Sequence, residues 1–184
     1  MDDQRIVKLF WERSEKAITE TSKKYGRYCH YIAYNILRND EDAEECVNDT
    51  YLNAWNCIPP HKPNRLQTFL GKITRNLSLN KYQQWTAQKR GGGQVSLILD
   101  ELSECVSKND GDIIDQIVIK DLLNRFLESQ TPENCKLFVR RYWYMSSIKE
   151  IATDYGMSEN NVTVTLFRIR KELKTYLEKE GISV

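Results

Sequence analysis

The segment from Tyr155 to Leu177 has the apolar spacing of one long helix, and it constrains the fold more than any other stretch of the chain. Its apolar residues step by four, three, four and four, which places on one helical face Val162, Leu166, Ile169, Leu173 and Leu177. The opposite face carries amides and hydroxyls first and cations later. This pattern is typical of a helix that reads DNA, but also of an amphipathic helix that only closes a small domain.

A short helix and a tight turn precede this long helix. Ile148, Ile151 and Ala152 form an apolar face, and Ala152 is small enough for a close helix crossing. Gly156 lies where a helix end needs a left-handed residue, and Ser158 can cap the next helix. A short helix, a turn with glycine and a longer helix make the layout of a helix-turn-helix, whose second helix enters the major groove. The alternative is an ordinary antiparallel helix pair, which explains the small residue, glycine and cap less well.

The rest of the chain is also predicted to be helical, without strand-like alternation long enough to trust. The expected helices cover residues 4–23, 27–37, 41–56 with Asp40 as cap, 66–88, 113–128, 133–144, 148–155 and 159–178. Three glycines at 91–93 are the plainest break. We therefore predict an all-α fold of two small helical domains, 1–90 and 112–184, joined by a flexible linker at 91–111. The C-terminal domain is the helix-turn-helix. The apolar patch "VSLILDEL" inside the linker is expected to dock on another part of the protein.

Composition excludes several classes of protein. A chain of 184 residues with 40% apolar content can bury a core in each of two domains. No apolar run approaches the roughly 20 residues of a membrane span, and the charged N-terminus does not resemble a signal peptide. Five scattered cysteines without a C-x-x-C pair, and only two histidines, indicate a reducing cytoplasm and no zinc site. Without a P-loop or paired carboxylates near a basic groove, we expect no enzyme, catalytic residue, metal, cofactor or small-molecule substrate.

The net charge of +1 hides a strong segregation of charge along the chain. Residues 40–49 hold six acids and no base, whereas residues 61–93 hold seven Lys and Arg residues and no acid. A simple binder of duplex DNA is usually more uniformly basic, because phosphate contacts supply much of its affinity. The pattern predicts a protein that meets two partners of different charge.

Three segments carry a family resemblance. "IKEIATDYGMSENNVTVTLFRIRKEL" resembles the C-terminal DNA-binding region of bacterial sigma factors of the sigma-70 family, particularly the small extracytoplasmic-function type. "DEDAEECVNDTYLNAWN" looks like the polymerase-binding helix of that family, and "LQTFLGKITRNLSLNKYQQ" looks like its promoter-melting and −10-reading helix. The resemblance covers nearly the whole chain in the expected order. It implies two helical domains that bind core RNA polymerase and promoter DNA.

In the acidic helix, helical spacing turns Ala43, Val47, Thr50 and Ala54 inward. The outer face then holds Glu45, Asn48, Asp49 and Asn53. The resemblance implies that this face grips a coiled coil of the largest polymerase subunit, although the family usually has glutamine where this chain has Asn48. The alternative is a solvated acidic face without a partner.

In the basic helix, cations alternate with amides and aromatic side chains, the mixture that binds single-stranded nucleic acid. Phe69, Leu70, Ile73 and Leu77 are expected in the core. The candidate −10 DNA residues are His61, Lys62, Lys72, Arg75, Asn76, Asn80, Lys81, Gln84 and Trp85. By resemblance, Asn76 lies near the pocket for an extruded −10 base. The loop "CIPPHKPN" lacks the aromatic residue that some family members place there, and His61 and Lys62 are the candidates to replace it.

In the last helix, the candidate −35 residues are Asn160, Asn161, Thr163, Val164, Thr165, Arg168 and Lys171. The family often has a basic residue or two at the positions of Thr163, Val164 and Thr165. Hydroxyls and methyls can still read bases, for instance against a thymine methyl group. The later cations, including Arg170 and Lys174, can hold the DNA backbone. The spacing leaves open whether Phe167 packs inside or lies at the groove edge.

The leading hypothesis is a cytoplasmic sigma factor that binds core RNA polymerase and directs promoter-specific initiation by reading a duplex −35 and a single-stranded −10 element. An anti-sigma protein is a further candidate partner, and no membrane insertion is expected. The alternative is a dimeric helix-turn-helix regulator of a duplex operator. That alternative gives the acidic helix and the basic segment no obvious role.

Overall fold

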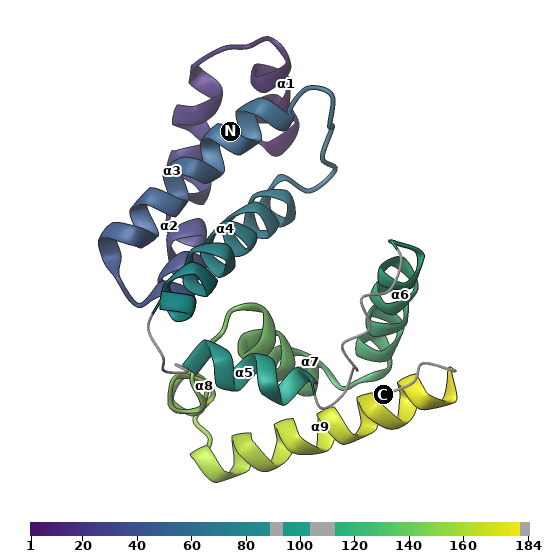
Figure 1. The fold of residues 1–184 in the computed structure, drawn as a ribbon. Helices are drawn as coiled ribbons and strands as arrows, with labels where there is room; N and C mark the ends of the chain where they lie inside the picture. The colour runs from purple at the N-terminus through teal and green to yellow at the C-terminus, as the bar shows by residue number, and fades with distance from the viewer. Residues whose placement is uncertain (89–93, 104–112, 181–184) are drawn as a thin grey trace. The chain divides into compact units, whose positions relative to one another are not determined.

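The structure, a computed structural model, describes residues 1–88, 94–103 and 113–180 (Figure 1). All regular structure within these ranges is helical, which confirms the predicted all-α class. The chain divides into two compact units, Met1–Gly91 and Gly92–Val184. Within the described ranges, no helix is both long enough and apolar enough to cross a membrane.

The first unit consists of α1 (Asp3–Trp11), α2 (Lys16–Leu37), α3 (Asp40–Cys57) and α4 (Leu66–Gln88). Helices α2, α3 and α4 all pack against one another, and α1 packs on α2. The core between them includes the fully buried side chains of Phe10, Ile32, Ile58, Leu66 and Leu70. Helices α2 and α4, the two longest of this unit, therefore each present one face to the core and the other face to solvent.

The start of this unit differs from the prediction of one helix at 4–23 that ends before Gly26. Helix α1 ends at Trp11, and Arg13 adopts a left-handed φ of 53° while its guanidinium donates to the Trp55 carbonyl at 2.6 Å. Gly26 instead lies inside α2. A Cβ there would stand 3.2 Å from the Tyr51 hydroxyl, so this glycine permits close packing of α2 on α3 and does not end a helix.

Helix α3 begins one residue earlier than expected. Asn39, and not Asp40, is the cap, because its side-chain oxygen accepts from the Asp42 amide at 3.0 Å. Arg38 in the left-handed conformation ends α2 just before it. Asp40 thus becomes the first of three acids in the first helical turn, where the helix dipole favours negative charge.

Helices α3 and α4 meet along a seam of buried hydroxyls. Thr50, Thr74 and Ser78 are all fully buried, and the Thr50 and Thr74 hydroxyls lie 3.0 Å apart. The buried face of α4 is therefore Leu66, Leu70, Thr74 and Ser78. Of the residues predicted as its core, Leu70 is fully buried, whereas Phe69, Ile73 and Leu77 are only half-buried.

The second unit consists of α5 (Gln94–Ser103), α6 (Ile113–Ser129), α7 (Pro132–Phe138), η1 (Val139–Trp143), α8 (Ile148–Tyr155) and α9 (Glu159–Lys179). Helix α9 packs on α6, α7 and α8, and its five predicted apolar residues are all buried. The expected helix 133–144 changes to a π-helical turn at Val139. This turn shifts the helical register, and Arg141 and Tyr142 are both buried.

The predicted linker 91–111 contains a helix. Helix α5 is formed by the apolar patch, and it docks on η1 with Val95 and Ile98 buried. Residues 94–103 are therefore an ordered part of the second unit and not a flexible connection. The other predicted linker residues, 91–93 and 104–111, lie outside the described residues.

Candidate functional site

The outer face of α3 carries the predicted acid and amide residues. Glu45 and Asn48 are exposed, whereas Asp49 and Asn53 are half-buried, and the Asn53 amide donates to the Asp49 carbonyl at 2.9 Å. The four residues expected to turn inward, Ala43, Val47, Thr50 and Ala54, are buried. Helical spacing therefore predicted the inward face correctly, whereas two of the four residues on the predicted outer face are half-buried.

Leu52 is a member of the α3 surface that sequence reasoning missed. It is 57% exposed, although it is a large apolar residue. It stands one helical turn after Asn48 and next to Asn53, so it lies on the same outer face. The sequence indicated this exposure, because Leu52 does not belong to the inward-facing series Ala43, Val47, Thr50 and Ala54. An exposed leucine between polar residues adds apolar contact area to a candidate binding surface.

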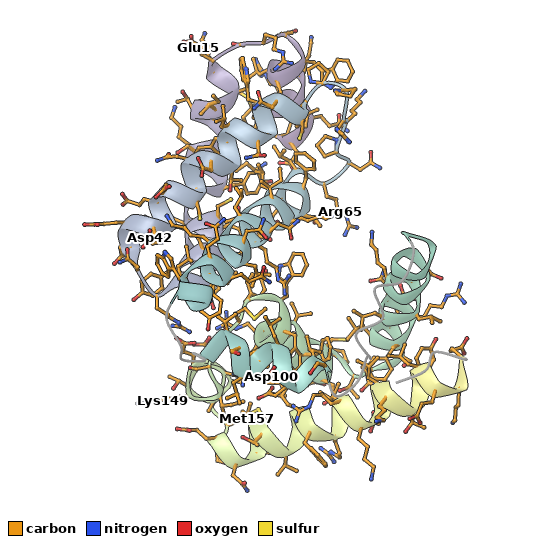
Figure 2. All side chains as sticks on the ribbon, in the orientation of Figure 1. Glu15, Asp42, Arg65, Asp100, Lys149 and Met157 are labelled. Atoms are coloured by element: carbon orange, nitrogen blue, oxygen red, sulfur yellow. The ribbon has the colours of Figure 1, made fainter. Side chains whose placement is uncertain are left out.

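Lys81 links this surface to α4. Its ammonium group pairs with Asp42 at 2.7 Å and with Glu45 at 2.6 Å, and Asp42 lies near the start of α3 (Figure 2). Burial alone would lower the pKa of Lys81, but the two carboxylates outweigh it and raise the pKa to about 12. Lys81 was predicted to contact −10 DNA; here its charge is instead neutralised by two acids of α3.

The outer face of α4 is a polar stripe with few cations. Lys72, Asn76, Asn80 and Gln84 step by four residues and are all exposed. Trp85 is half-buried, and so is Arg75, whose burial lowers the pKa of its guanidinium. His61 and Lys62 are exposed in the loop that precedes α4. The structure thus aligns four of the nine predicted residues in one row, with amides in the majority.

The turn between α8 and α9 has the predicted caps. At the start of α8 the structure adds a reciprocal capping box, formed by Ser147 and Glu150, that was not predicted. Gly156 ends α8 with a φ of 63°, and the Ser158 hydroxyl accepts from the Asn161 amide at 3.2 Å. These contacts confirm the helix–turn–helix geometry that the glycine and serine predicted.

Most of the predicted residues of α9 face solvent: Asn160, Asn161, Thr163, Val164, Arg168 and Lys171 are exposed. Thr165 is the exception, because it is only 7% exposed and its hydroxyl lies 3.5 Å from the Asn161 side chain. The prediction that Thr165 faces the groove is therefore wrong. Its position three residues after the buried Val162 puts it on the core face. The Thr163 hydroxyl donates its hydrogen to the Glu159 carbonyl at 2.8 Å, so its oxygen can act only as an acceptor toward another group.

The open question about Phe167 is answered by its exposure. Its side chain is 57% exposed, and the Arg170 guanidinium lies over the ring, 5.9 Å from its centroid. Val164, one turn earlier, is also exposed. Two apolar side chains thus stand in the middle of the surface of α9 that faces away from the core.

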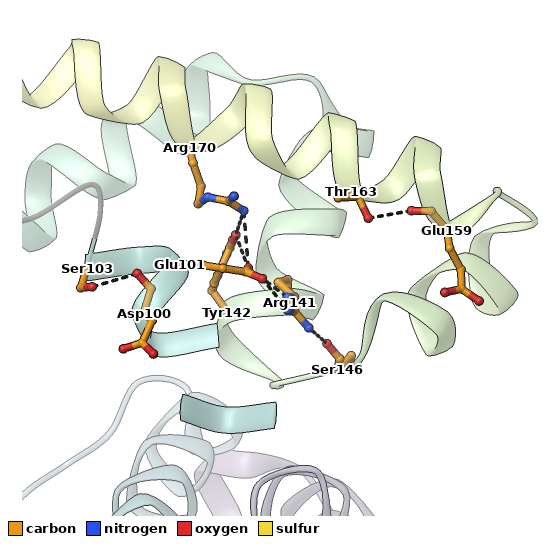
Figure 3. A network of polar contacts seen from close by, with 9 residues as sticks. All are labelled: Asp100, Glu101, Ser103, Arg141, Tyr142, Ser146, Glu159, Thr163 and Arg170. Atoms are coloured by element: carbon orange, nitrogen blue, oxygen red, sulfur yellow. Dashed lines mark hydrogen bonds and ion pairs between the residues drawn. The ribbon is translucent and has the colours of Figure 1, made fainter. Parts of the chain in front are cut away.

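A polar network joins α5 to the rest of the second unit (Figure 3). Glu101 accepts from the buried Arg141 at 2.6 and 3.2 Å, and from the Tyr142 hydroxyl at 3.1 Å. Arg170 of α9 donates to the Tyr142 hydroxyl at 2.7 Å and to Glu101 at 3.4 Å. Burial raises the pKa of Tyr142. Arg170 is therefore committed to this network, although the sequence suggested a DNA-backbone contact for it.

In the part of the chain that the structure describes, no group of three or more His, Cys, Asp or Glu side chains could hold a metal ion.

Comparison with known proteins finds similarity over the first unit and over most of the chain. Residues 22–88, which span most of α2 and all of α3 and α4, match the family Sigma-70 region 2. The extracytoplasmic-function RNA polymerase sigma factor SigE of Mycolicibacterium smegmatis (strain ATCC 700084 / mc(2)155) is 22% identical over 164 residues, or 88% of this chain. The chain spans 62% of the length of that relative. Residues 22–88 are thus similar to region 2 of the sigma-70 family, and most of the chain is similar to a sigma factor of the extracytoplasmic-function type.

Proposed function

We propose that this protein is a sigma factor that binds core RNA polymerase and directs initiation at promoters with −35 and −10 elements. One observation carries the proposal. The region 2 match falls on the helices that bear the acid-and-amide face of α3 and the polar stripe of α4, while a separate unit carries the helix-turn-helix. Each of the three expected contacts, with polymerase, with the −10 element and with the −35 element, thus has a candidate surface of its own.

The proposed polymerase surface is formed by Glu45, Asn48, Asp49, Leu52 and Asn53. Its carboxylates would repel nucleic acid, which favours a protein partner. Leu52 supplies an exposed apolar centre among groups that can form hydrogen bonds, the composition typical of an interface with another protein. This surface is the candidate to grip core polymerase.

The proposed −10 surface follows α4 and the loop before it. Lys72, Asn76, Asn80 and Gln84 form its exposed row, with His61 and Lys62 in the loop and Arg75 and Trp85 at its side. Amides can bond to the edges of bases once these are unpaired, and aromatic rings can stack on them. Lys81 would serve mainly to fix α3 against α4, through its two carboxylate partners.

The proposed −35 surface is the exposed face of α9. Asn160, Asn161, Thr163 and Val164 would face base edges, and Arg168 and Lys171 would hold phosphates. Thr165 is removed from this set because it is buried. Since the base-reading half of α9 has no cation, binding of this unit to duplex DNA on its own should be weak.

The remaining parts of the proposal follow from this role. The protein would act in the cytoplasm, where bacterial transcription takes place, and by binding and strand capture, without catalysis of its own. Extracytoplasmic-function sigma factors usually have anti-sigma partners, so an anti-sigma protein is proposed as a further partner. Two weak DNA contacts held on one polymerase would act jointly, because tethering raises effective concentration.

The test is association with purified core polymerase, followed by run-off transcription from a promoter library. Asp49→Arg should abolish association, because it places a cation in the centre of an anionic face. Glu15→Arg makes the same charge reversal at an exposed position at the start of α2 and should leave association unchanged. Equal binding by the parent and Asp49→Arg would remove the proposed interface. A stable dimer that binds a duplex operator tightly without polymerase would instead support a dimeric regulator.

A further inference from the structure

Val164 and Phe167 form an apolar pair on the exposed face of α9. Val164 is 50% exposed and Phe167 is 57% exposed, although both side chains are apolar. They stand three residues apart, so helical geometry places them side by side on neighbouring turns of one face. Exposed apolar residues that stand singly are common on protein surfaces, whereas an adjacent pair in the middle of a candidate binding surface indicates an apolar contact with the partner.

The charges around this pair favour DNA over protein as that partner. Residues 160–171 contain three cations and no acid. Arg170 lies over the Phe167 ring, 5.9 Å from its centroid, and Arg168 and Lys171 are exposed beside the pair. An apolar centre with cations around it and no acid matches a groove of duplex DNA, which has phosphates along its edges and bases on its floor.

Thymine is the base that suits the pair. In the major groove the other three bases present only groups that form hydrogen bonds, whereas thymine adds a methyl group to its O4 acceptor. Val164 and Phe167 have no side-chain group that bonds to a base edge, and the hydrogen of the nearby Thr163 hydroxyl is already donated to the Glu159 carbonyl at 2.8 Å (Figure 3). A G·C pair opposite the two side chains would lose hydrogen bonds to water without replacement, whereas a methyl group would gain an apolar contact.

We propose that Val164 and Phe167 are specificity-determining residues that recognise the C5-methyl groups of thymines in the −35 element. This inference rests on the proposed function and names the chemical feature that its α9 surface reads. Residues three apart in a helix rise about 4.5 Å along its axis, and neighbouring base pairs are about 3.4 Å apart, so the pair can contact methyl groups on two neighbouring base pairs. Arg168 and Lys171 would bind phosphates and add affinity without regard to sequence.

The test uses the full-length protein with core polymerase and a promoter library in which the −35 element is randomised. We expect the selected elements to carry thymines at two neighbouring base pairs. Each of these thymines is then replaced by deoxyuridine, which removes the methyl group and keeps the base pairing. Loss of one contacted methyl group should weaken promoter binding about fourfold, which corresponds to about 0.8 kcal/mol.

Val164→Ala and Phe167→Ala show whether these side chains make the contact. Each variant should lose the deoxyuridine penalty at its own thymine and keep the penalty at the other one. Arg168→Gln is the matched control, because it should weaken binding to all promoters to a similar extent and leave both penalties as in the parent. Both apolar positions are at least half exposed, so neither truncation should unfold α9, which circular dichroism checks.

Several outcomes would overturn the inference and leave the proposed function intact. These are the selection of −35 elements without thymine, the absence of any deoxyuridine penalty, and penalties that persist in both alanine variants. Weaker association of both variants with core polymerase, without a deoxyuridine penalty, would make the pair a protein contact and would also overturn the inference. A parent protein that neither joins core polymerase nor selects a −35 element would remove the proposed function and this inference with it.

Discussion

The seam between α3 and α4 has three short polar contacts around Thr50 and Thr74, but these two hydroxyls have only two hydrogen atoms to donate. The Thr50 hydroxyl lies 2.7 Å from the Cys46 carbonyl, the Thr74 hydroxyl lies 2.9 Å from the Leu70 carbonyl, and the two hydroxyls lie 3.0 Å apart. Each hydroxyl has a single hydrogen to donate. Two of these three contacts can therefore be hydrogen bonds at one time. Each hydroxyl therefore contributes one hydrogen bond, whether or not the other is present.

The hydrogen count predicts that the losses add when the two threonines are replaced by valine, which has the same shape. Either single substitution removes one buried hydrogen bond and should lower the free energy of unfolding by about 1 kcal/mol. The remaining threonine still bonds to the carbonyl of its own helix. Removing that last hydroxyl removes the second hydrogen bond, so the double variant should lose about 2 kcal/mol. The coupling energy should thus be close to zero, whereas three independent contacts would give a coupling energy of about 1 kcal/mol.

Urea unfolding followed by tryptophan fluorescence can measure this cycle. The chain has four tryptophans, of which only Trp143 belongs to the second unit, so a Trp143→Phe background reports on the first unit alone. Thr68→Val, at an exposed position of α4, is the control and should change the free energy of unfolding by less than about 0.5 kcal/mol. If the two single losses together exceed the loss of the double variant by about 1 kcal/mol, all three contacts act as hydrogen bonds and the shared use of hydrogens in the seam is refuted.

Two further predictions concern the helix-turn-helix. Thr163→Ala should change which −35 sequences are used in run-off selection more than it changes affinity for polymerase, while the buried substitution Thr165→Val should leave that selection as in the parent; identical selection by Thr163→Ala and the parent would discard the contact. Gly156→Ala should lower the free energy of unfolding by about 1 kcal/mol in thermal unfolding, because a Cβ there meets no atom within 4 Å yet the left-handed φ of 63° is strained for alanine. No loss of stability on this substitution would contradict the left-handed turn.

Helices with strong local signals were predictable from the sequence. The predicted bounds of α4 and α8 agree with the structure, and Gly156 ends α8 as its place in the sequence predicted. The break between α1 and α2 was missed because it depends on a contact between residues far apart in the chain, Arg13 and the Trp55 carbonyl. The prediction that a helix ends before Gly26 was wrong for the same reason. Its role comes from the approach of Tyr51, which sequence spacing does not show.

The candidate surfaces were predictable as far as helical spacing decides them. Exposure on α3 and α9 follows the angle around each helix, and Thr165 was assigned to the wrong face because its hydroxyl was given more weight than its spacing from Val162. Pairings between distant elements could not be predicted. Lys81 pairs with acids 36 and 39 residues away, and Glu101 pairs with Arg170 across 69 residues, so spacing within one helix shows neither pairing.

These pairings change the expected electrostatics of the first unit. With Lys81 neutralised by Asp42 and Glu45, and Arg75 half-buried, the exposed row of α4 keeps Lys72 as its one cation among three amides. Each phosphate contact contributes to the salt dependence of binding, so a surface with one cation in its row should bind single strands weakly and with a shallow salt dependence. Amides, by contrast, bond to base edges and discriminate between bases. A strand-binding surface of this kind would gain little from non-specific DNA, and its affinity at a promoter would have to come from attachment to polymerase through α3 and from the second contact made by α9.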